Sequence, residues 1–345
     1  MRYKLTLRWL GTHYCGWQVQ PNAPTICGAV QDAVERLFGE RGELTGCSRT
    51  DSGVHAVGFV AALKCESCRI PPEALQRALN VNLPKEIAVT GCCAVEEDFH
   101  PRYDAAAKRY RYRWYQSATR DPFREGVAVQ LPRPVDAEAM DRAAKRLLGT
   151  HNFSAFCASG GKIPPEERVR TLTECAVTQT GDEIHLTVTG DGFLYHMVRI
   201  IAGTLVKIGM GVYPPEKMEE ILEEKNRAAA GPTIPARGLT LVSLEYEKEL
   251  APYLEGENKH WHYVLDQRNV PEKGLAYLTI ERCEPEELDG VLRRVIHQAY
   301  RNGAKQVFVR DTFGEEGSIC GYYRLRRQPE TEEGWLEAVY EGEHR

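Results

Sequence analysis

The chain has 345 residues, of which 42% are hydrophobic and 27% are charged, a composition typical of soluble globular proteins with a sizeable core. No segment approaches the roughly 18 consecutive apolar residues that a membrane-spanning helix needs, and the N-terminus lacks the apolar stretch of a secretory signal. We therefore expect a cytoplasmic protein. The eleven cysteines are odd in number and scattered, which argues against a disulfide framework.

The net charge of −5 comes from one part of the chain. Of the 44 basic and 49 acidic residues, 13 and 18 lie in residues 251–345, which leaves 31 of each in residues 1–250. Binding to nucleic acid depends on the charges that face the phosphates and not on the total. This balance therefore neither indicates nor excludes an RNA partner.

Strand and helix patterns alternate along residues 1–105. An apolar period of two residues is typical of strands and a period of 3.6 of helices. The stripe formed by Val30, Val34, Leu37 and Phe38 predicts a helix that begins near Gly28. We expect, in chain order, a strand at residues 4–10, that helix, a strand at residues 54–63, and a helix at residues 72–80 with proline at its start.

Residues 106–247 repeat this alternation. Both stretches therefore predict an α+β fold with two RRM-like (ferredoxin-like, split βαβ) domains, residues 1–105 and 106–247, built on antiparallel sheets. In the second stretch we expect strands at residues 110–115, 174–178, 184–189 and 239–244, and helices at residues 137–148, 193–207 and 214–225.

Residues 248–345 predict an appended small α/β module. Its apolar periodicity is too regular for a disordered tail, with strands expected at residues 275–280, 306–310 and 321–326 and a helix at residues 286–300. Because phosphates repel a net negative segment, we expect it to pack away from RNA or to bind an unknown protein partner. Local basic residues argue the other way: Arg293, Arg294, Arg301, Lys305, Arg324, Arg326 and Arg327.

The stretch Ser48–Ala56 places an acid and a base on a glycine-containing turn in front of an apolar strand. Loops on rigid scaffolds commonly carry functional groups, which makes Asp51 a candidate for catalysis. The alternative is a simple turn, in which Asp51 accepts local backbone hydrogen bonds and Gly53 supplies a positive φ.

The stretch Lys108–Tyr115 separates basic from aromatic side chains. As a strand, it would show Lys108, Tyr110, Tyr112 and Trp114 on one face and three arginines on the other. One interpretation is a nucleic-acid surface; the other is a strand with an aromatic core face and a solvated basic face.

Metal ligands are sparse in this sequence. Cys65 and Cys68 have the spacing of a zinc knuckle, and His260 and His262 form a second pair. Neither pair has the further ligands that a complete site needs, so we expect no metal and no cofactor.

Several ordered blocks carry a resemblance to a known family. The chain resembles the bacterial tRNA pseudouridine synthase A family over residues 1–247, and so many blocks in one order are more specific than a single motif. Ser48 stands where glycine is usual. The blocks are Tyr14–Gln18, Gly28–Gln31, Ser48–Ala56, Asn80–Pro84, Asp98–Tyr103, Lys108–Tyr112, Gly149–Phe156, His196–Arg199 and Gly238–Leu241.

The resemblance implies a fold and a set of roles. It implies two RRM-like domains whose sheets form one surface with a central cleft, a homodimer, and Asp51 as the carboxylate that attacks C1′ or removes a proton at C2′. Arg199 would pair with Asp51, although from periodicity alone it could equally face solvent or cap a carbonyl. Tyr110 would stack on the target uracil and receive the C5 proton.

The remaining roles concern binding of the substrate. Arg49 would stabilise the uridine after it leaves the stem, and Lys108, Arg109 and Arg111 would contact the RNA. Leu239 and Leu241 would line the uracil pocket, with ordinary core packing as the equal alternative.

The sequence therefore predicts an RNA-modifying isomerase that converts uridine to pseudouridine at positions 38 to 40 of the tRNA anticodon stem-loop. An RNA-binding protein without chemistry is the first alternative, although binding alone gains nothing from a buried acid near phosphates. A nucleosidase is the second, and it would require another acid near Asp51.

Overall fold

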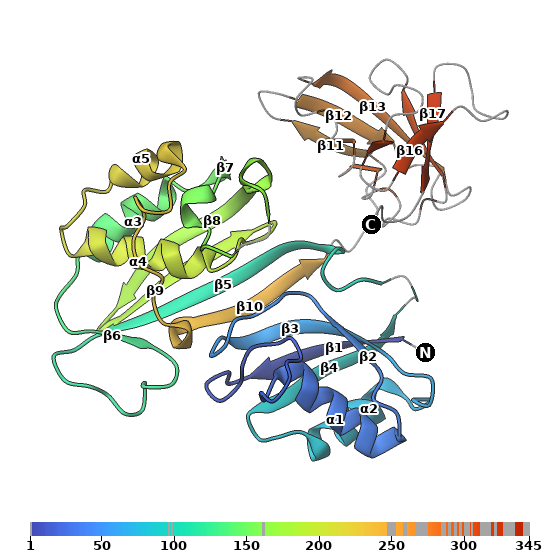
Figure 1. Cartoon of the computed structure of the whole chain (residues 1–345), viewed down its shortest axis with the longest axis horizontal. Helices are drawn as coiled ribbons and strands as arrows, with labels where there is room; N and C mark the ends of the chain where they lie inside the picture. Colours follow the sequence, from blue (N-terminus) through green and yellow to red (C-terminus); the bar gives the residue numbers. More distant parts are fainter. Residues whose placement is uncertain are drawn as a thin grey trace. The chain divides into compact units, whose positions relative to one another are not determined.

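The computed structural model describes residues 2–95, 97, 99–160 and 163–246, together with the strands and a set of single residues between positions 253 and 340. The chain divides into two compact units, Met1–Tyr246 and Glu247–Arg345 (Figure 1). Each unit has its own hydrophobic core. The mixture of helices and mainly antiparallel strands gives an α+β fold.

The first half of the N-terminal unit packs two helices on a small sheet. Every second residue of its first strand is buried, and Tyr3, Leu5 and Leu7 share one core with the buried residues of both helices. The first helix begins after Thr25, whose hydroxyl caps the Gly28 amide. The elements are β1 (Arg2–Trp9), α1 (Ile26–Phe38), β2 (Glu43–Gly46), β3 (His55–Lys64), α2 (Pro72–Asn82) and β4 (Ile87–Val95).

The second half repeats this scheme with three helices. Asp136 caps its first helix through the Ala139 amide, and the apolar helix that follows the last hairpin is almost entirely buried. The elements are β5 (Ala105–Gln116), β6 (Val129–Leu131), α3 (Ala137–Lys145), β7 (Gly149–Asn152), β8 (Val169–Thr180), β9 (Glu183–Gly190), α4 (Met197–Gly209), α5 (Lys217–Glu224) and β10 (Leu239–Tyr246), with short 3₁₀ turns at Ser154–Phe156, Pro165–Glu167 and Ala236–Gly238.

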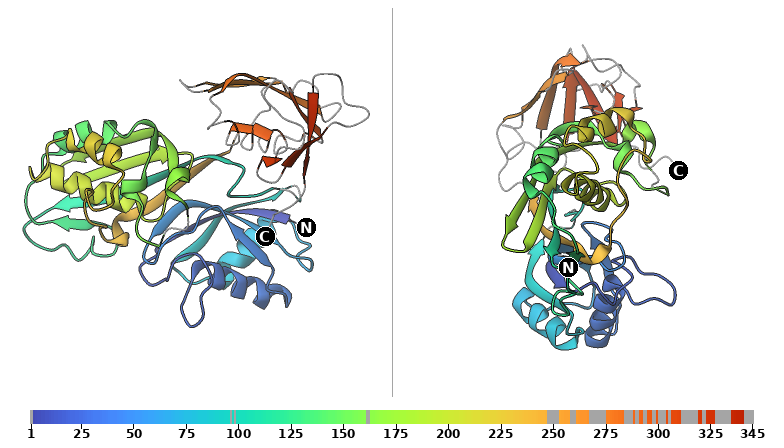
Figure 2. Two further views of the ribbon diagram at one scale, coloured as in Figure 1. Left: turned by 45° about the horizontal axis from the view of Figure 1, so that its top comes forward. Right: turned by 90° about the vertical axis from the view of Figure 1, so that its left-hand side faces the viewer.

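One ten-stranded sheet runs through both halves (Figures 1 and 2). Its main path is β4-β1-β3-β10-β5-β9-β8-β7, in which β10 pairs antiparallel with β5 and parallel with β3. The parallel pairing involves only Thr240 with His55 and Leu241 with Ala56. These few residues join the two halves, and β10 passes close to Gly58, where a Cβ atom would lie 2.6 Å from the Val242 carbonyl oxygen.

The predicted elements of this unit are confirmed, with shifted ends. The helix predicted at residues 193–207 begins only at Met197, because His196 has the left-handed φ of 60°. The charged helix begins at Lys217 and not at the two prolines before it. The strands β2, β4, β6 and β7 were not expected, since three of them are short edge strands and β4 contains a glycine and a register shift.

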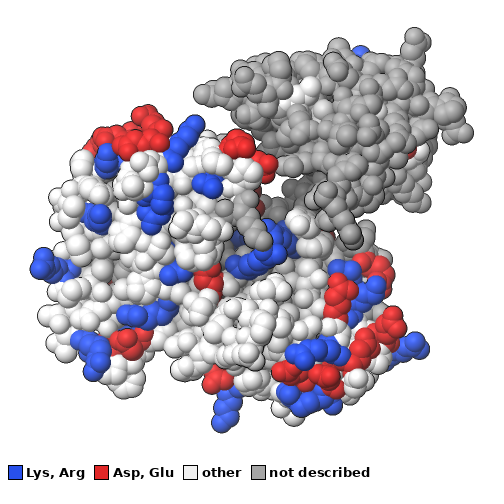
Figure 3. Space-filling model, in the orientation of Figure 1, with Lys and Arg blue, Asp and Glu red and all other residues white. Residues whose placement is uncertain are grey.

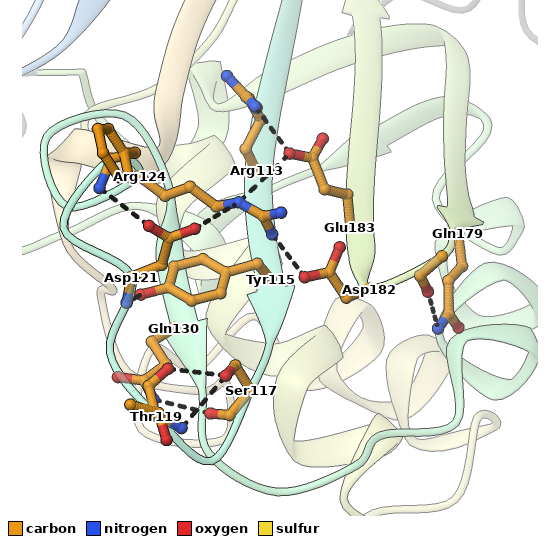
Figure 4. Close-up of polar contacts among 12 residues, drawn as sticks. Arg113, Tyr115, Ser117, Thr119, Asp121, Arg124, Gln130, Gln179, Asp182 and Glu183 are labelled. Atoms are coloured by element: carbon orange, nitrogen blue, oxygen red, sulfur yellow. Dashed lines mark hydrogen bonds and ion pairs between the residues drawn. The ribbon is translucent and has the colours of Figure 1, made fainter.

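The long loop between β5 and β6 is fastened by Arg124 (Figure 4). Its guanidinium lies 3.1 Å from the Asp121 carboxylate and 2.7 Å from that of Asp182, and it stacks over the ring of Tyr115. The Tyr115 hydroxyl accepts a hydrogen bond from the Asp121 amide. These contacts hold the loop against β5 and against the β8–β9 turn.

The C-terminal unit is a seven-stranded sheet with helical residues in its core. β13 and β14 pair in parallel, and the connection between them contains the buried helical residues Val291, Leu292, Val295 and Ile296. The predicted basic side chains of this unit lie outside the described residues. In sheet order the strands are β11 (Tyr253–Glu257), β12 (Trp261–Asp266), β13 (Leu275–Cys283), β14 (Gln306–Arg310), β17 (Trp335–Tyr340), β16 (Tyr323–Arg326) and β15 (Ile319–Cys320).

The junction between β3 and β10 yields a test of stability. We expect Gly58→Ala to lower the free energy of unfolding by about 1–3 kcal/mol, because the new methyl group meets backbone and not a movable side chain. Gly91→Ala in β4 is the matched control, since its Cβ would lie at an ordinary 3.4 Å from Thr6 Oγ1. Equal unfolding midpoints in urea for the two variants would contradict the prediction.

Candidate active site

The loop between β2 and β3 carries Asp51, and the segment after β1 holds it in place. The Gly53 amide donates to the Tyr14 carbonyl at 3.1 Å, and the Trp17 amide donates to the Thr50 carbonyl at 3.3 Å. The Trp9 indole donates to the Val54 carbonyl at 3.0 Å. Two contacts from this segment and one from Trp9 at the end of β1 therefore define the path of the loop on both sides of Asp51.

Two glycines allow this close approach. A Cβ atom on Gly11 would lie 2.1 Å from the Val54 carbonyl oxygen, and one on Gly16 would lie 2.3 Å from the Thr50 carbonyl oxygen. Gly16 also has a φ of +85°, which residues with a side chain rarely adopt. The Tyr14–Gln18 block is thus explained by backbone packing against the loop.

Arg199 pairs with Asp51. Its Nη1 donates to Asp51 Oδ2 at 3.0 Å, and its Nε donates to the Ile234 carbonyl at 2.8 Å. The side chains of Arg199 and Asp51 are 15% and 24% exposed, so the pair is largely shielded from water. The pairing expected from the resemblance is present, and it places α4 of the second half against the loop of the first.

His196 is a second neighbour of Asp51, and no sequence pattern indicated a role for it. Its Nε2 lies 3.3 Å from Asp51 Oδ2, and its ring stacks on Tyr195 with centroids 3.8 Å apart. Burial lowers the pKa of His196; Asp51 raises it, and Arg199 and Arg227 lower it further. Its position three residues before Arg199, at the start of a helix, was the only available sequence signal.

Tyr110 lies beside the loop on β5. Its hydroxyl is 3.3 Å from Ser48 Oγ, and Phe193 packs edge-on against its ring at 5.1 Å. Burial raises the pKa of Tyr110 well above its usual value; the Ser48 contact lowers it, and Cys47 and Asp51 raise it. The phenol is therefore neutral at pH 7. Ser48, the departure noted in the sequence, supplies this contact.

His55 links three segments around the site. The Gly11 amide donates to its Nδ1 at 2.9 Å, so the ring proton resides on Nε2, which donates to the Arg237 carbonyl at 3.0 Å. Burial lowers the pKa of His55. The neutral imidazole thus ties the strand after Asp51 to the turn that leads into β10.

The structure corrects the predicted role of Lys108. Its side chain is only 8% exposed, and its ammonium donates to the Cys47 carbonyl at 2.8 Å. Burial lowers the pKa of Lys108 to about 8. A group enclosed in this way does not reach a phosphate; it supports the first residues of the loop.

Arg109 and Arg111 point away from Asp51. Tyr110 and Leu241 are register partners on the face of Asp51, and neighbouring strand residues point to the opposite face. Arg109 pairs with Glu174 at 2.9 Å and with the Thr189 hydroxyl at 3.0 Å, and Arg111 is exposed. Their predicted contact with RNA would therefore use the reverse face of the sheet.

The other predicted binding residues divide into exposed and buried ones. Arg49 is exposed and has no hydrogen bond or ion pair with any residue that the structure describes. Leu239 and Leu241 are 6% and 0% exposed and belong to the core. Figure 3 shows basic and acidic side chains interspersed over one face of the N-terminal unit, with neither sign dominant.

Metal and membrane features are absent from the described part of the chain. It holds no group of three or more His, Cys, Asp or Glu side chains that could bind a metal ion. Cys65 and Cys68 are buried, and His260 lies outside the described residues. Within the same residues no helix is long and apolar enough to cross a membrane.

Comparisons with known proteins converge on one family. A family model described as tRNA pseudouridine synthase matches residues 7–104 and 143–247. tRNA pseudouridine synthase A of Moorella thermoacetica is 45% identical over 245 residues, which is 70% of this chain and 98% of that protein. The enzyme of the same name from Myxococcus xanthus is 44% identical over 247 residues, 71% of this chain and 92% of that protein.

The family model covers only part of the chain, and the match to a solved structure is weak. The family model leaves out residues 105–142, which include Tyr110, and ends at residue 247. A solved archaeal box H/ACA sRNP Nop10–Cbf5 complex aligns with 66% of this chain and 60% of that one at 12% identity, with a TM-score of 0.28, too low to support a structural comparison.

His55 makes stability depend on pH. The lowered pKa means that the unfolded chain binds the proton more readily than the folded chain does. The contribution of His55 to the free energy of unfolding is therefore fully present above the ordinary histidine pKa of about 6.5 and decreases as the pH drops below it. We expect the stability advantage of wild type over His55→Gln, which does not titrate, to shrink between pH 7.5 and 5.5, by at most about 1.4 kcal/mol per pH unit. Urea unfolding at several pH values measures this, and parallel profiles would refute it.

Proposed function

Because the chain belongs to the tRNA pseudouridine synthase family, we propose that it converts uridine to pseudouridine at positions 38 to 40 of the tRNA anticodon stem-loop. It is an RNA-modifying isomerase. The observation that carries the proposal is the Asp51–Arg199 pair at 3.0 Å, in which a largely shielded carboxylate on a loop fastened by backbone hydrogen bonds meets a guanidinium.

The reaction requires few catalytic groups. The N1–C1′ bond breaks, the detached uracil turns, C5 bonds to C1′, C5 loses a proton and N1 gains one, so no electrons are gained or lost. Asp51 acts either as a nucleophile at C1′ or as a base at C2′, and both remain open. Arg199 sets its positive charge against the Asp51 carboxylate and donates a hydrogen bond to Oδ2.

The surroundings of Asp51 argue against hydrolysis of the glycosidic bond. A glycosidase sets two carboxyl groups across the scissile bond. Among the described residues, the charged or ionisable side chains in contact with Asp51 are Arg199 and His196, and no second carboxyl group lies there. A nucleosidase is therefore disfavoured.

Tyr110 has two proposed roles, stacking on the uracil and receiving the C5 proton. A neutral phenol is a weak base, so the raised pKa of Tyr110 favours stacking and hydrogen bonding over direct removal of the proton. Its ring is fixed by Phe193 and its hydroxyl by Ser48. We propose that Leu239 and Leu241 support this ring from the core side.

The target uridine must leave the stem before Asp51 reaches its sugar, at a cost of a few kcal/mol. Arg49 is exposed two residues from Asp51, and we propose that it fills the vacated position. Arg109 and Arg111 would meet RNA only where it passes the reverse face of the sheet.

The order of strands and helices in the N-terminal unit supports two copies of one fold. The strand orders β4-β1-β3-β2 and β10-β5-β9-β8 are equivalent, and in each half a helix follows the first and third of these strands in the chain. We propose two RRM-like domains, residues 1–105 and 106–247, that form the cleft for tRNA in a cytoplasmic homodimer. Residues 248–345, with their negative charge, pack away from tRNA or bind a protein partner.

Asp51→Asn tests the function directly. We expect near wild-type tRNA binding and a loss of turnover of at least about 1000-fold, because the amide keeps the shape but is neither nucleophile nor base. Unmodified tRNA is incubated with each protein and pseudouridine is mapped by position. Asp32→Asn, an exposed partner of Arg41, is the matched control and should retain full activity. A folded Asp51→Asn protein that still modifies tRNA would disprove the assignment.

Tyr110→Phe separates the two roles of the phenol. The ring remains and only the hydroxyl is lost, so we expect unchanged tRNA binding and a smaller loss of turnover than in Asp51→Asn, about 10- to 100-fold. Single-turnover rates on the same tRNA measure it. A loss as large as that of Asp51→Asn would mean that the hydroxyl is indispensable for proton transfer, against the role favoured by its raised pKa.

A further inference from the structure

The two oxygens of the Asp51 carboxylate are treated differently by the protein. Arg199 Nη1 donates a hydrogen bond to Oδ2 at 3.0 Å, and His196 Nε2 lies 3.3 Å from the same oxygen without forming a hydrogen bond. Oδ1 has no hydrogen bond or ion pair with any residue in the described part of the chain. Oδ2 is therefore hydrogen-bonded on one side and approached by an imidazole on the other, while neither group binds Oδ1.

His196 is itself held firmly. It has a φ of 60° and a ψ of 10° directly before α4, and its carbonyl accepts the Ile200 amide at 3.0 Å. Its imidazole stacks on Tyr195, whose carbonyl accepts the Ala158 amide at 3.0 Å. A non-glycine residue in this backbone region carries a cost of about 1 kcal/mol or more, which is commonly accepted only where it places a side chain.

The charge state of His196 fits such a placement. The charged groups that face it are Asp51 on the loop, Arg199 on α4 and Arg227 after α5, and the net effect of its surroundings is a lowered pKa. A neutral ring can lie beside Oδ2 without cancelling the negative charge of Asp51. Among the described residues, Arg199 then supplies the one full positive charge in contact with the carboxylate.

We propose that His196 is a positioning residue which, together with Arg199, fixes Oδ2 of Asp51 and so prevents the carboxylate from turning, leaving Oδ1 as the reacting oxygen. This rests on the proposed function, in which the reaction partner is the C1′ carbon or the C2′ hydrogen of a uridine. A carboxylate held by one partner only can rotate about its Cβ–Cγ bond and exchange its two oxygens.

The test compares His196→Leu with His196→Gln. Both replacements are unbranched at Cβ and meet the same backbone conformation, but only glutamine carries an N–H near the position of Nε2. We expect the leucine variant to lose about 10- to 100-fold in kcat, because it removes the polar neighbour of Oδ2 on one side, with KM for tRNA within about 2-fold of wild type. We expect glutamine to restore kcat to within about 5-fold of wild type.

Controls separate positioning from folding and from the function itself. Unfolding midpoints of the two variants should agree, because their backbone costs match. His185→Leu, which removes a histidine paired with Glu183 on the reverse face, should leave kcat unchanged. A leucine variant as fast as wild type, or leucine and glutamine variants equally slow, would overturn the proposal. Absence of pseudouridine with the wild-type protein would refute the proposed function instead.

Discussion

The short parallel pairing of β10 with β3 is the contact on which the site depends. It involves two residue pairs, and it joins halves that otherwise have separate helices and separate hairpins. The loop of Asp51 enters β3 directly before this pairing, while Arg199 reaches Asp51 from α4, braced by the Ile234 carbonyl shortly before β10. An error of one residue in this register would separate the carboxylate from its cation.

Neutral buried groups, more than charges, hold the site together. His55 is fixed in one tautomer by a donor and an acceptor, and Tyr110 is kept protonated by burial. Because an uncompensated charge is expensive in such surroundings, the enzyme places one ion pair at its centre and supports it with hydrogen bonds. Among the residues that the structure describes, Asp51 is the one carboxylate that pairs with Arg199.

The two faces of β5 show how one strand serves two environments. Tyr110, Tyr112 and Trp114 are buried toward the helices, whereas the alternating arginines pair with Glu174 and Glu183 across the open face. These pairs neutralise two of the three arginines. The strand therefore contributes stacking and support to the active site and offers RNA only a modest basic surface, mainly Arg111, on its other side.

The sequence by itself determined the order of most strands and helices, the loop that carries Asp51 and the two faces of β5, because hydrophobic periodicity and turn chemistry are local. The ordered blocks also identified Arg199 as the partner of Asp51. Only the tertiary structure decided that Lys108 is enclosed, that Arg109 pairs with Glu174, that Ser48 meets Tyr110 and that His196 contacts Asp51. Those outcomes depend on the pairing of segments up to 182 residues apart, such as His55 with Arg237, and no local pattern encodes which side chains such a pairing brings into contact.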